Sequence, residues 1–352
     1  MTEDKTSKDD QIAGFHRYSR MLIGILLLFA FFSAYWLWLD YRNFVKQPIN
    51  FPEEHRVITI EKGMGINRLA NQLYQNEIIK SPIYLKLLAH LKPEYKNIKV
   101  GEYQLGETMK PDQLLSQLSK GVVIQYAFTI VEGQNIHEIL NNLANDSRLI
   151  PLEEFSDQQL LLKLGIESPS IEGWLFPETY YFSKGDSALS ILLRAKESME
   201  SVLAEEWHDR STNLPYDSPY QALIMASIIE KETGIAEERD EIAGVFVRRL
   251  RKNMRLQTDP TVIYGIGPEF NGDITRRDLK TPTAYNTYVI KGLPPTPIAM
   301  PSQASIYAAL HPAAGNTLYF VADGSGGHYF SETLEEHQLA VRRMLKRLRE
   351  NK

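Results

Sequence analysis

The sequence predicts an α+β protein attached to a membrane by one N-terminal helix. Three patterns carry this prediction: an uncharged apolar run at residues 21–39, a motif at residues 59–73 that recurs at residues 129–143, and an apolar segment at residues 217–234. A chain of 352 residues is long enough for two or three domains. Its hydrophobic and charged fractions, 43% and 24%, are those of a folded protein.

The composition excludes several kinds of site. The chain has no cysteine, which excludes disulfides, thiolate metal sites and a cysteine nucleophile. Its formal net charge of −5 shows no basic excess, which argues against nucleic acid as a partner. The histidines, among them His137, His311 and His337, lack the spacing of metal ligands. We therefore expect neither a metal nor a cofactor.

The apolar run at residues 21–39 predicts a transmembrane helix. At about 1.5 Å per residue it would span roughly 28 Å, close to the hydrocarbon core of a bilayer. Arg17 and Arg20 precede it and Asp40 follows it, which predicts a cytoplasmic N-terminus and an exported body. A cleaved signal peptide is the alternative, but its apolar region would be shorter, and no clean small-residue cleavage site follows.

The exported body contains an internal repeat. Residues 59–73 and 129–143 align at an offset of 70, and each predicts a β-rich run, a glycine turn and an amphipathic helix. A Gly-aromatic strand is predicted later in each copy, at residues 101–105 and 173–176. Two similar small α/β modules in tandem are the simplest interpretation.

The first copy resembles a LysM domain, a small βααβ fold that binds polymers containing N-acetylglucosamine. Where LysM motifs carry Asp-Thr after the turn glycine, this chain has Met64-Gly65. A spacer that holds the rest of the chain away from the membrane is the alternative, because a fold does not establish a site. The resemblance rests on Ile60-Glu61-Lys62-Gly63, on Ile66, Leu69 and Ala70, and on Val100-Gly101.

Residues 217–234 predict a buried helix. Ser218 is a good N-cap, Pro219 suits the first helical position, and Gly234 supplies a stop. The residues between them are apolar on nearly every face, which is typical of a core helix. Glu230 lies near its end, among apolar neighbours. Such surroundings keep a carboxyl group protonated to higher pH, as a glycoside-cleaving general acid requires.

Two alternatives to catalysis by Glu230 remain open on spacing alone. Glu232 lies about 200° further round the helix, on a different face, and is the weaker candidate for a proton donor. A glutamate near a helix end is also often solvated or ion-paired, here with Lys231 or Arg248.

Longer motifs surround Glu230: EGWLFPETY at residues 172–180, MRLQTDPTVIYG at residues 254–265, YNTY at residues 285–288 and GLPPTPI at residues 292–298. With the helix at residues 217–234 they resemble the endolytic murein transglycosylase family, whose members are lytic transglycosylases fixed to the bacterial inner membrane. The resemblance covers the chain from about Val57 to the C-terminus. In that family the glutamate of the Ile-Glu-Lys-Glu-Thr helix is the catalytic acid, which corresponds here to Glu230.

The resemblance implies a reaction that needs one carboxylate. Glu230 would protonate the oxygen between N-acetylmuramic acid and N-acetylglucosamine. It would then accept the proton of the muramoyl C6 hydroxyl as that oxygen closes onto C1. The product is a 1,6-anhydro end, no water is consumed and no metal is required. A muramidase that hydrolyses the same bond, which normally needs two carboxylates, and a noncatalytic tether to peptidoglycan are the alternatives.

The resemblance also implies partners and a location. The substrate would be nascent peptidoglycan glycan strands, cut so that elongation ends or strands are trimmed, with peptidoglycan synthases as possible partners. The predicted parts are a cytoplasmic N-terminus at residues 1–20, a transmembrane helix at residues 21–39, a stalk at residues 40–55, the LysM-like module at residues 56–125 and a periplasmic catalytic domain at residues 126–352, whose residues 126–185 form the second repeat.

Further residues are candidates for sugar contact, and each also has a structural interpretation. Asp259-Pro260 suits the N-cap and first position of a short helix, and tyrosine rings commonly fill cores. The candidates are Trp174, Glu178, Gln257, Thr258, Asp259, Tyr285, Asn286 and Tyr288.

Near the C-terminus, residues 324–327 predict a hairpin loop, and Thr333 with Glu336 predicts a capping box.

Overall fold

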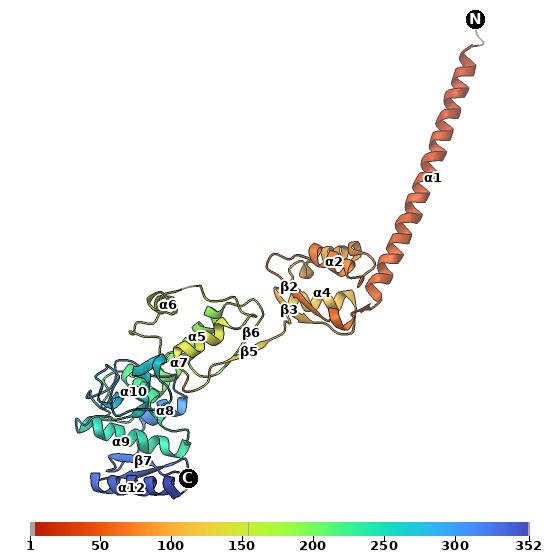
Figure 1. Ribbon diagram of the computed structural model, residues 1–352. Helices are drawn as coiled ribbons and strands as arrows, with labels where there is room; N and C mark the ends of the chain where they lie inside the picture. Colours follow the sequence, from red (N-terminus) through yellow and green to blue (C-terminus); the bar gives the residue numbers. More distant parts are fainter. Residues whose placement is uncertain (1–3, 154, 351–352) are drawn as a thin grey trace. The chain divides into compact units, whose positions relative to one another are not determined.

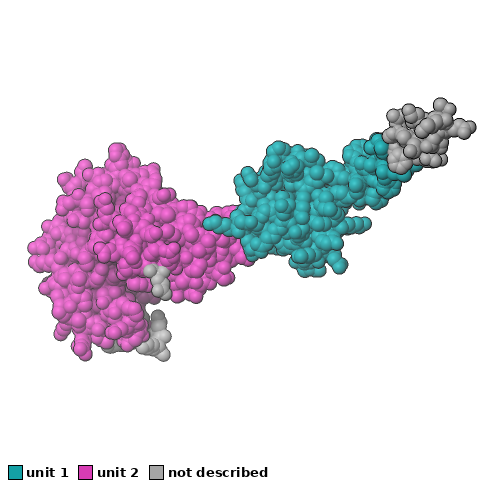
Figure 2. All heavy atoms as spheres, turned by 90° about the horizontal axis from the view of Figure 1, so that it is seen from above, with its two compact units in different colours: residues 1–124 teal, residues 125–352 magenta. Residues whose placement is uncertain are grey.

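The computed structural model describes residues 4–153 and 155–350, which fall into two compact units (Figure 2). Unit 1 ends at Ile124 and unit 2 begins at Gln125. Unit 1 contains α1 (Asp4–Lys46), β1 (Ile49–Asn50), η1 (Glu53–His55), β2 (Val57–Ile60), α2 (Ile66–Gln75), α3 (Pro82–Leu91), η2 (Pro93–Tyr95), β3 (Gly101–Gln104), β4 (Thr108–Met109) and α4 (Pro111–Lys120) (Figure 1).

Unit 2 is mostly helical, with two short antiparallel strand pairs. Its elements are β5 (Tyr126–Thr129), α5 (Ile136–Ala144), α6 (Asp157–Leu164), β6 (Thr179–Phe182), α7 (Ala188–His208), α8 (Pro219–Glu232), η3 (Ala236–Glu238), α9 (Arg239–Arg251), α10 (Asp259–Ile266), η4 (Gly267–Glu269), η5 (Asp278–Lys280), α11 (Gln303–Leu310), β7 (Tyr319–Ala322), β8 (His328–Ser331) and α12 (Leu334–Glu350).

The first helix is long and apolar enough to cross a membrane. Its segment Met21–Lys46 contains a window of 18 residues with a mean hydropathy of 2.2. The helix continues beyond the predicted end at Leu39, and Tyr41, Phe44 and Val45 pack against the core of unit 1. Their spacing repeats at the helical period, which explains why the helix persists. Much of the segment predicted as a stalk is therefore folded into unit 1, including the fully buried Phe51.

Each unit contains one β–α–α–β module. In module 1, β2 pairs antiparallel with β3 and α2 and α3 lie between them in sequence, and in module 2 β5 pairs with β6 around α5 and α6 in the same order. The aligned glycines of the two turns, Gly63 and Gly133, have φ of +82° and +75°. Glycine adopts this left-handed region without steric cost. The repeat in the sequence is therefore also a repeat of structure.

The predicted strand at residues 173–176 is wrong. These residues form a turn with φ of +83° at Gly173, and strand pairing begins only at Thr179. Pro177 has no amide hydrogen to donate to a sheet, which favours a later start. The corresponding prediction in the first copy is confirmed, because β3 begins at Gly101.

The core of unit 2 is built around α8, as its apolar sequence predicts. Residues 222–229 are all buried, and α8 packs mainly against α11, with α9 and α7 alongside. The Ser218 hydroxyl accepts from the amide of Gln221 at 3.4 Å, which confirms the predicted N-cap. The helix ends at Glu232 because the backbone of Thr233 is extended.

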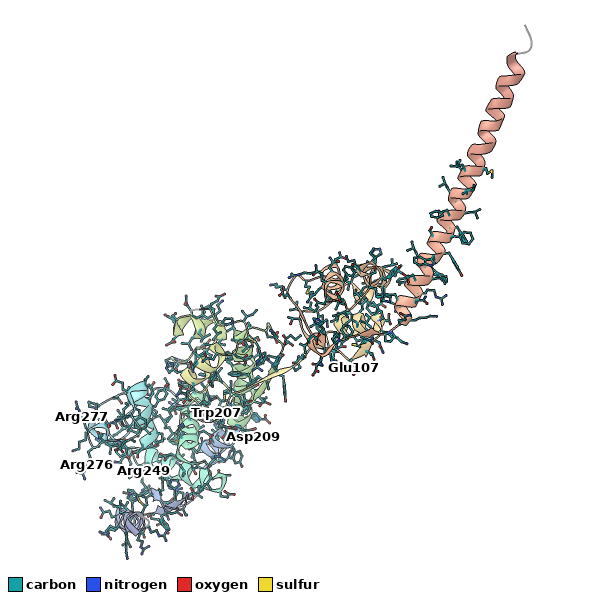
Figure 3. The ribbon with its side chains drawn as sticks, turned by 45° about the vertical axis from the view of Figure 1, so that its right-hand side comes forward. Glu107, Trp207, Asp209, Arg249, Arg276 and Arg277 are labelled. Carbon is teal, nitrogen blue, oxygen red and sulfur yellow. The ribbon has the colours of Figure 1, made fainter. Side chains whose placement is uncertain are left out.

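A hairpin and the last helix complete unit 2. Strands β7 and β8 flank the predicted loop, and α12 lies beside β7 (Figure 1). The amide of Thr333 donates to Glu336 at 3.1 Å and the Thr333 hydroxyl accepts from the Glu336 amide at 3.2 Å, which confirms the capping box. Buried Arg249 of α9 (labelled in Figure 3) donates to the carbonyls of Leu318 and Leu256 at 2.6 and 2.7 Å, fixing the hairpin to α9.

Gly173→Ala is expected to destabilise unit 2 by about 2–4 kcal/mol. Its φ is left-handed, and an added Cβ would lie 2.6 Å from Cβ and Cγ of Pro297. Gly234→Ala is the matched control, with open space around the new atom and an expected change within about 0.5 kcal/mol. Thermal unfolding of the full chain by near-UV circular dichroism measures both. Equal Tm values would contradict the tight packing of Gly173.

Candidate active site

Glu230 lies in the last turn of α8, half-buried, and faces the N-terminus of α11. Its Oε2 atom accepts from the backbone amide of Ser302 at 2.9 Å, from the Ser305 hydroxyl at 2.7 Å and from the Ser302 hydroxyl. Ser302 is the N-cap of α11, so the carboxylate lies at the positive end of that helix. These bonds all go to one oxygen and fix the orientation of the group.

The turn of module 2 packs against Glu230. The Gly133 amide donates to the carbonyl of Met300 at 2.8 Å, and the Gly133 carbonyl accepts from Nζ of Lys231 at 3.1 Å. A Cβ at Gly133 would lie 3.6 Å from Cδ of Lys231 and 4.0 Å from Cγ of Glu230. The equivalent position at Gly63 has no atom within 4 Å. The same turn is thus docked on the Glu230 helix in module 2 and open in module 1.

A cavity of about 750 Å³ opens beside Lys231. The side facing α5 is polar and the side facing α10 is apolar, a combination that suits a sugar with its hydroxyl edges and flat ring faces. Its lining includes Asn135, His137, Glu138 and Asn141 from α5 and its N-cap, Pro260, Ile263 and Tyr264 from α10, and Pro268, Phe270 and Ile298.

Glu172 connects the two walls of this cavity. Its carboxylate accepts from the amide of Ile136, the first residue of α5, at 3.1 Å and from the Tyr264 hydroxyl of α10 at 3.0 Å. Glu172 is fully buried, and this burial raises its pKa to about 7, against the opposing effect of the two hydrogen bonds. The spacing of α5 and α10 therefore depends on a buried carboxyl group.

A second cluster surrounds Glu232, on the other face of α8. The Thr258 hydroxyl donates to the Glu232 carboxylate, and the Thr258 amide donates to the Thr287 hydroxyl at 3.0 Å. Burial raises the pKa of Glu232 to about 7, while the Thr258 hydrogen bond acts in the opposite direction. The Tyr288 hydroxyl donates to Asp259 at 2.6 Å at the start of α10.

The predicted N-cap at Asp259 is wrong by one residue. Thr258 is the N-cap, with an extended backbone, and Asp259 is the first residue of the helix. Thr258, Asp259 and Tyr288 thus gather near Glu232 rather than Glu230. Gln257 is exposed and has a left-handed φ of +54°.

The other candidate residues are spread over unit 2. Trp174 stacks on Tyr220, with ring centroids 6.0 Å apart, near the opposite end of α8 from Glu230. The ring of Tyr285 lies 4.9 Å from that of Tyr264, which brings it close to the cavity wall. Buried Asn286 uses its amide to hold the carbonyls of Asp278 and Thr281 at 2.9 and 2.7 Å, a scaffold role. Glu178 is exposed beside β6.

The suggested ion-pair partners of Glu230 are engaged elsewhere. Lys231 donates to Gly133, and Arg248 pairs with Glu241 at 3.1 Å while donating to the Ala313 carbonyl at 2.7 Å.

Sequence reasoning missed the residues that hold Glu230 and those that line the cavity. The spacing of Ser302 and Ser305 is that of an N-cap, which predicts a helix start but not which carboxylate faces it. His137, singled out in the sequence only for lacking the spacing of a metal ligand, is exposed and lines the cavity.

Comparisons with known proteins agree with one another. The YceG-like family model matches residues 58–343. A Bacillus subtilis protein named endolytic murein transglycosylase is 32% identical over 302 residues, covering 80% of this chain and 83% of the relative. A Streptococcus pneumoniae protein of the same name is 26% identical over 324 residues, covering 82% of this chain and 58% of the relative. The crystal structure of a yceG-like protein from Listeria monocytogenes has a TM-score of 0.50 and 29% identity, over 80% of this chain and 98% of that one.

Proposed function

Because the chain belongs to the YceG-like family, we propose that it is an endolytic lytic transglycosylase that cuts the bond between N-acetylmuramic acid and N-acetylglucosamine in peptidoglycan strands. The observation that carries this proposal is the environment of the Glu230 carboxylate. Three donors orient its carboxylate, and the cavity for a glycan opens one residue further along the helix, at Lys231.

In the first step, protonated Glu230 donates its proton to the glycosidic oxygen. The bond between that oxygen and the muramoyl C1 breaks, and the N-acetylglucosamine side leaves with a 4-hydroxyl. Glu230 becomes a carboxylate as positive charge develops at C1. The Ser302 amide and the Ser302 and Ser305 hydroxyls donate to this new carboxylate, so they stabilise the charge as it forms.

In the second step, the carboxylate accepts the proton of the muramoyl C6 hydroxyl, and O6 bonds to C1. The product carries a 1,6-anhydro ring, Glu230 is protonated again, and no water is consumed. One carboxyl group acts as acid and then as base. The other carboxylate at the end of α8, Glu232, is bonded to Thr258 on another face of the helix.

The proposal extends to the location of the enzyme. The N-terminus would be cytoplasmic, residues 21–39 of α1 would cross the inner membrane, and the rest of unit 1 from Asp40 onward and all of unit 2 would lie in the periplasm. Module 1, with its βααβ order, would act as a LysM-like module next to the membrane. Nascent strands from peptidoglycan synthases would be cut as they leave the bilayer, ending or trimming their elongation.

Digestion of purified peptidoglycan by the full chain in liposomes tests the reaction, with the products identified by mass spectrometry. We expect muropeptides with 1,6-anhydro ends from inside the strands. Reducing ends would identify a muramidase instead. No new ends from either isolated or nascent strands would favour the noncatalytic tether.

Ser305→Ala is expected to lower kcat about tenfold, because it removes a hydrogen bond to a charged group, worth about 1.5 kcal/mol or more. The Ser302 contacts remain, so KM should change little. Ser190→Ala is the matched control, since Ser190 occupies a similar place at the start of α7 and donates to the Ser187 carbonyl at 2.7 Å. A Ser305→Ala variant with the kcat of the Ser190→Ala control would remove this contact from the mechanism.

A further inference from the structure

Helix α3 of unit 1 carries an exposed apolar stripe. Ile83, Leu87 and Leu91 are 66%, 38% and 59% exposed. They recur every four residues and form one continuous strip about 12 Å long. Leu85 and Ala89 are buried in the core of unit 1, about 180° round the helix from the centre of the strip. The stripe therefore points away from the core of its own unit.

The start of α3 is fixed to α1 where the apolar run ends. The Tyr84 hydroxyl donates to Asp40 at 2.7 Å, and Asp40 directly follows Leu39, the last residue of that run. The ring of Tyr84 also lies 6.1 Å from Tyr41 and 5.7 Å from Phe44. Because these contacts involve one face of α1 within five residues, α3 is held at the level where α1 would leave a bilayer.

Two side chains mark this level on α1 as a membrane–water interface. The guanidinium of Arg42 lies 4.7 Å from the ring of Trp38. Tryptophan and arginine are both favoured at the interface, where one contacts acyl chains and the other lipid headgroups. The α3 attachment point at Asp40 lies between them in the sequence.

The charge of α3 suits anionic headgroups. The helix, PIYLKLLAHL, contains Lys86 and His90 and has no acidic residue, and exposed Lys80 precedes it. An apolar strip flanked by basic residues is the pattern of a helix that lies in the plane of a bilayer surface.

We propose that α3 is a second membrane contact: its stripe of Ile83, Leu87 and Leu91 lies in the headgroup boundary of the bilayer that α1 crosses. The inference rests on α1 spanning that bilayer and is independent of the reaction assigned to Glu230. With two attachments, module 1 is held against the membrane surface and does not swing on a single helix.

Site-specific fluorescence in liposomes tests this contact, because the chain has no native cysteine. The full chain carrying Ile83→Cys, Leu87→Cys or Leu91→Cys is labelled with NBD and reconstituted into phosphatidylglycerol and phosphatidylethanolamine. Val122→Cys is the matched control in the same unit, with Val122 61% exposed and outside α3. We expect blue-shifted emission and quenching by shallow doxyl-labelled lipid at the three stripe positions, and iodide-accessible, unshifted emission at Val122.

Three outcomes overturn the proposal. Stripe labels that behave like the Val122 label lie in water. Stripe labels protected from both iodide and doxyl lipid are covered by protein, as in contact with a second copy. If the Val122 label were quenched by doxyl lipid as strongly as the stripe labels, unit 1 would adsorb to the bilayer without using the stripe. As a further check, Leu87→Glu in the Ile83→Cys chain should shift the NBD emission back toward that in water.

Discussion

The Glu230→Gln variant is expected to lose about 10²–10⁴-fold in the rate of peptidoglycan cleavage, the usual contribution of a general acid–base residue. Glutamine keeps the size of the side chain and can still accept from Ser302 and Ser305 through its oxygen, so the fold should persist. It cannot donate a proton to a glycosidic oxygen or accept one from the C6 hydroxyl. Release of soluble muropeptides by the full chain measures the rate.

Glu232→Gln is the decisive comparison, because burial raises the pKa of Glu232 to about 7, a value that suits a general acid. Its carboxylate is bonded to Thr258, away from the Gly133 turn, and we expect this variant to retain most activity. Glu237→Gln, at an exposed position nearby, controls for surface charge. If Glu232→Gln lost activity and Glu230→Gln kept it, the acid would be Glu232 instead.

We also expect the free energy of unfolding of the chain to fall between pH 4.5 and pH 7 because of Glu172. Its folded-state pKa is about 7, above the ordinary 4.5, so the folded chain retains a proton there that the unfolded chain has lost. The stabilisation is fully present below pH 4.5 and is lost as the pH rises through 7. A shift of this size lowers the free energy of unfolding by an amount on the order of 3 kcal/mol over this pH range.

Glu172→Gln removes this titration, so its unfolding free energy should fall less steeply over the same pH range. Denaturant unfolding of the full chain at pH 5 and pH 8 measures the difference. Glu232 titrates near the same pH in both proteins and therefore cancels in the comparison. Glu167→Gln, an exposed neighbour, should follow the wild type. If the free energy of unfolding changed equally with pH in the wild type and in Glu172→Gln, the Glu172 carboxyl group would be ionised in the folded protein at both pH values.

Local sequence signals predicted the helix that carries Glu230 but not the environment of its carboxylate. Ser218 and Pro219 act on their own helix, so the start of α8 follows from adjacent residues. Ser302 lies 72 residues beyond Glu230, and its bond to the carboxylate depends on how α11 packs on α8. The apolar periodicity of these two segments does not predict that Ser302 contacts Glu230.

The errors have similar physical causes. Tyr41, Phe44 and Val45 are spaced for a helix, but their partners in unit 1 are distant in sequence, so the sequence alone predicts a stalk there. The aromatic neighbours of Gly173 favour a strand, whereas the chain turns there and the adjacent Glu172 is buried and bonded to Ile136 and Tyr264.

The two copies of the β–α–α–β module leave different space for a side chain at their turn glycines. Around the turn at Gly63 a new side chain would meet open space, and only the left-handed backbone conformation opposes it. At Gly133 an added Cβ would lie in van der Waals contact with Lys231 and Glu230, so a larger side chain would displace these residues. The same turn is thus open to a side chain in module 1 and closed in by the helix that carries Glu230 in module 2.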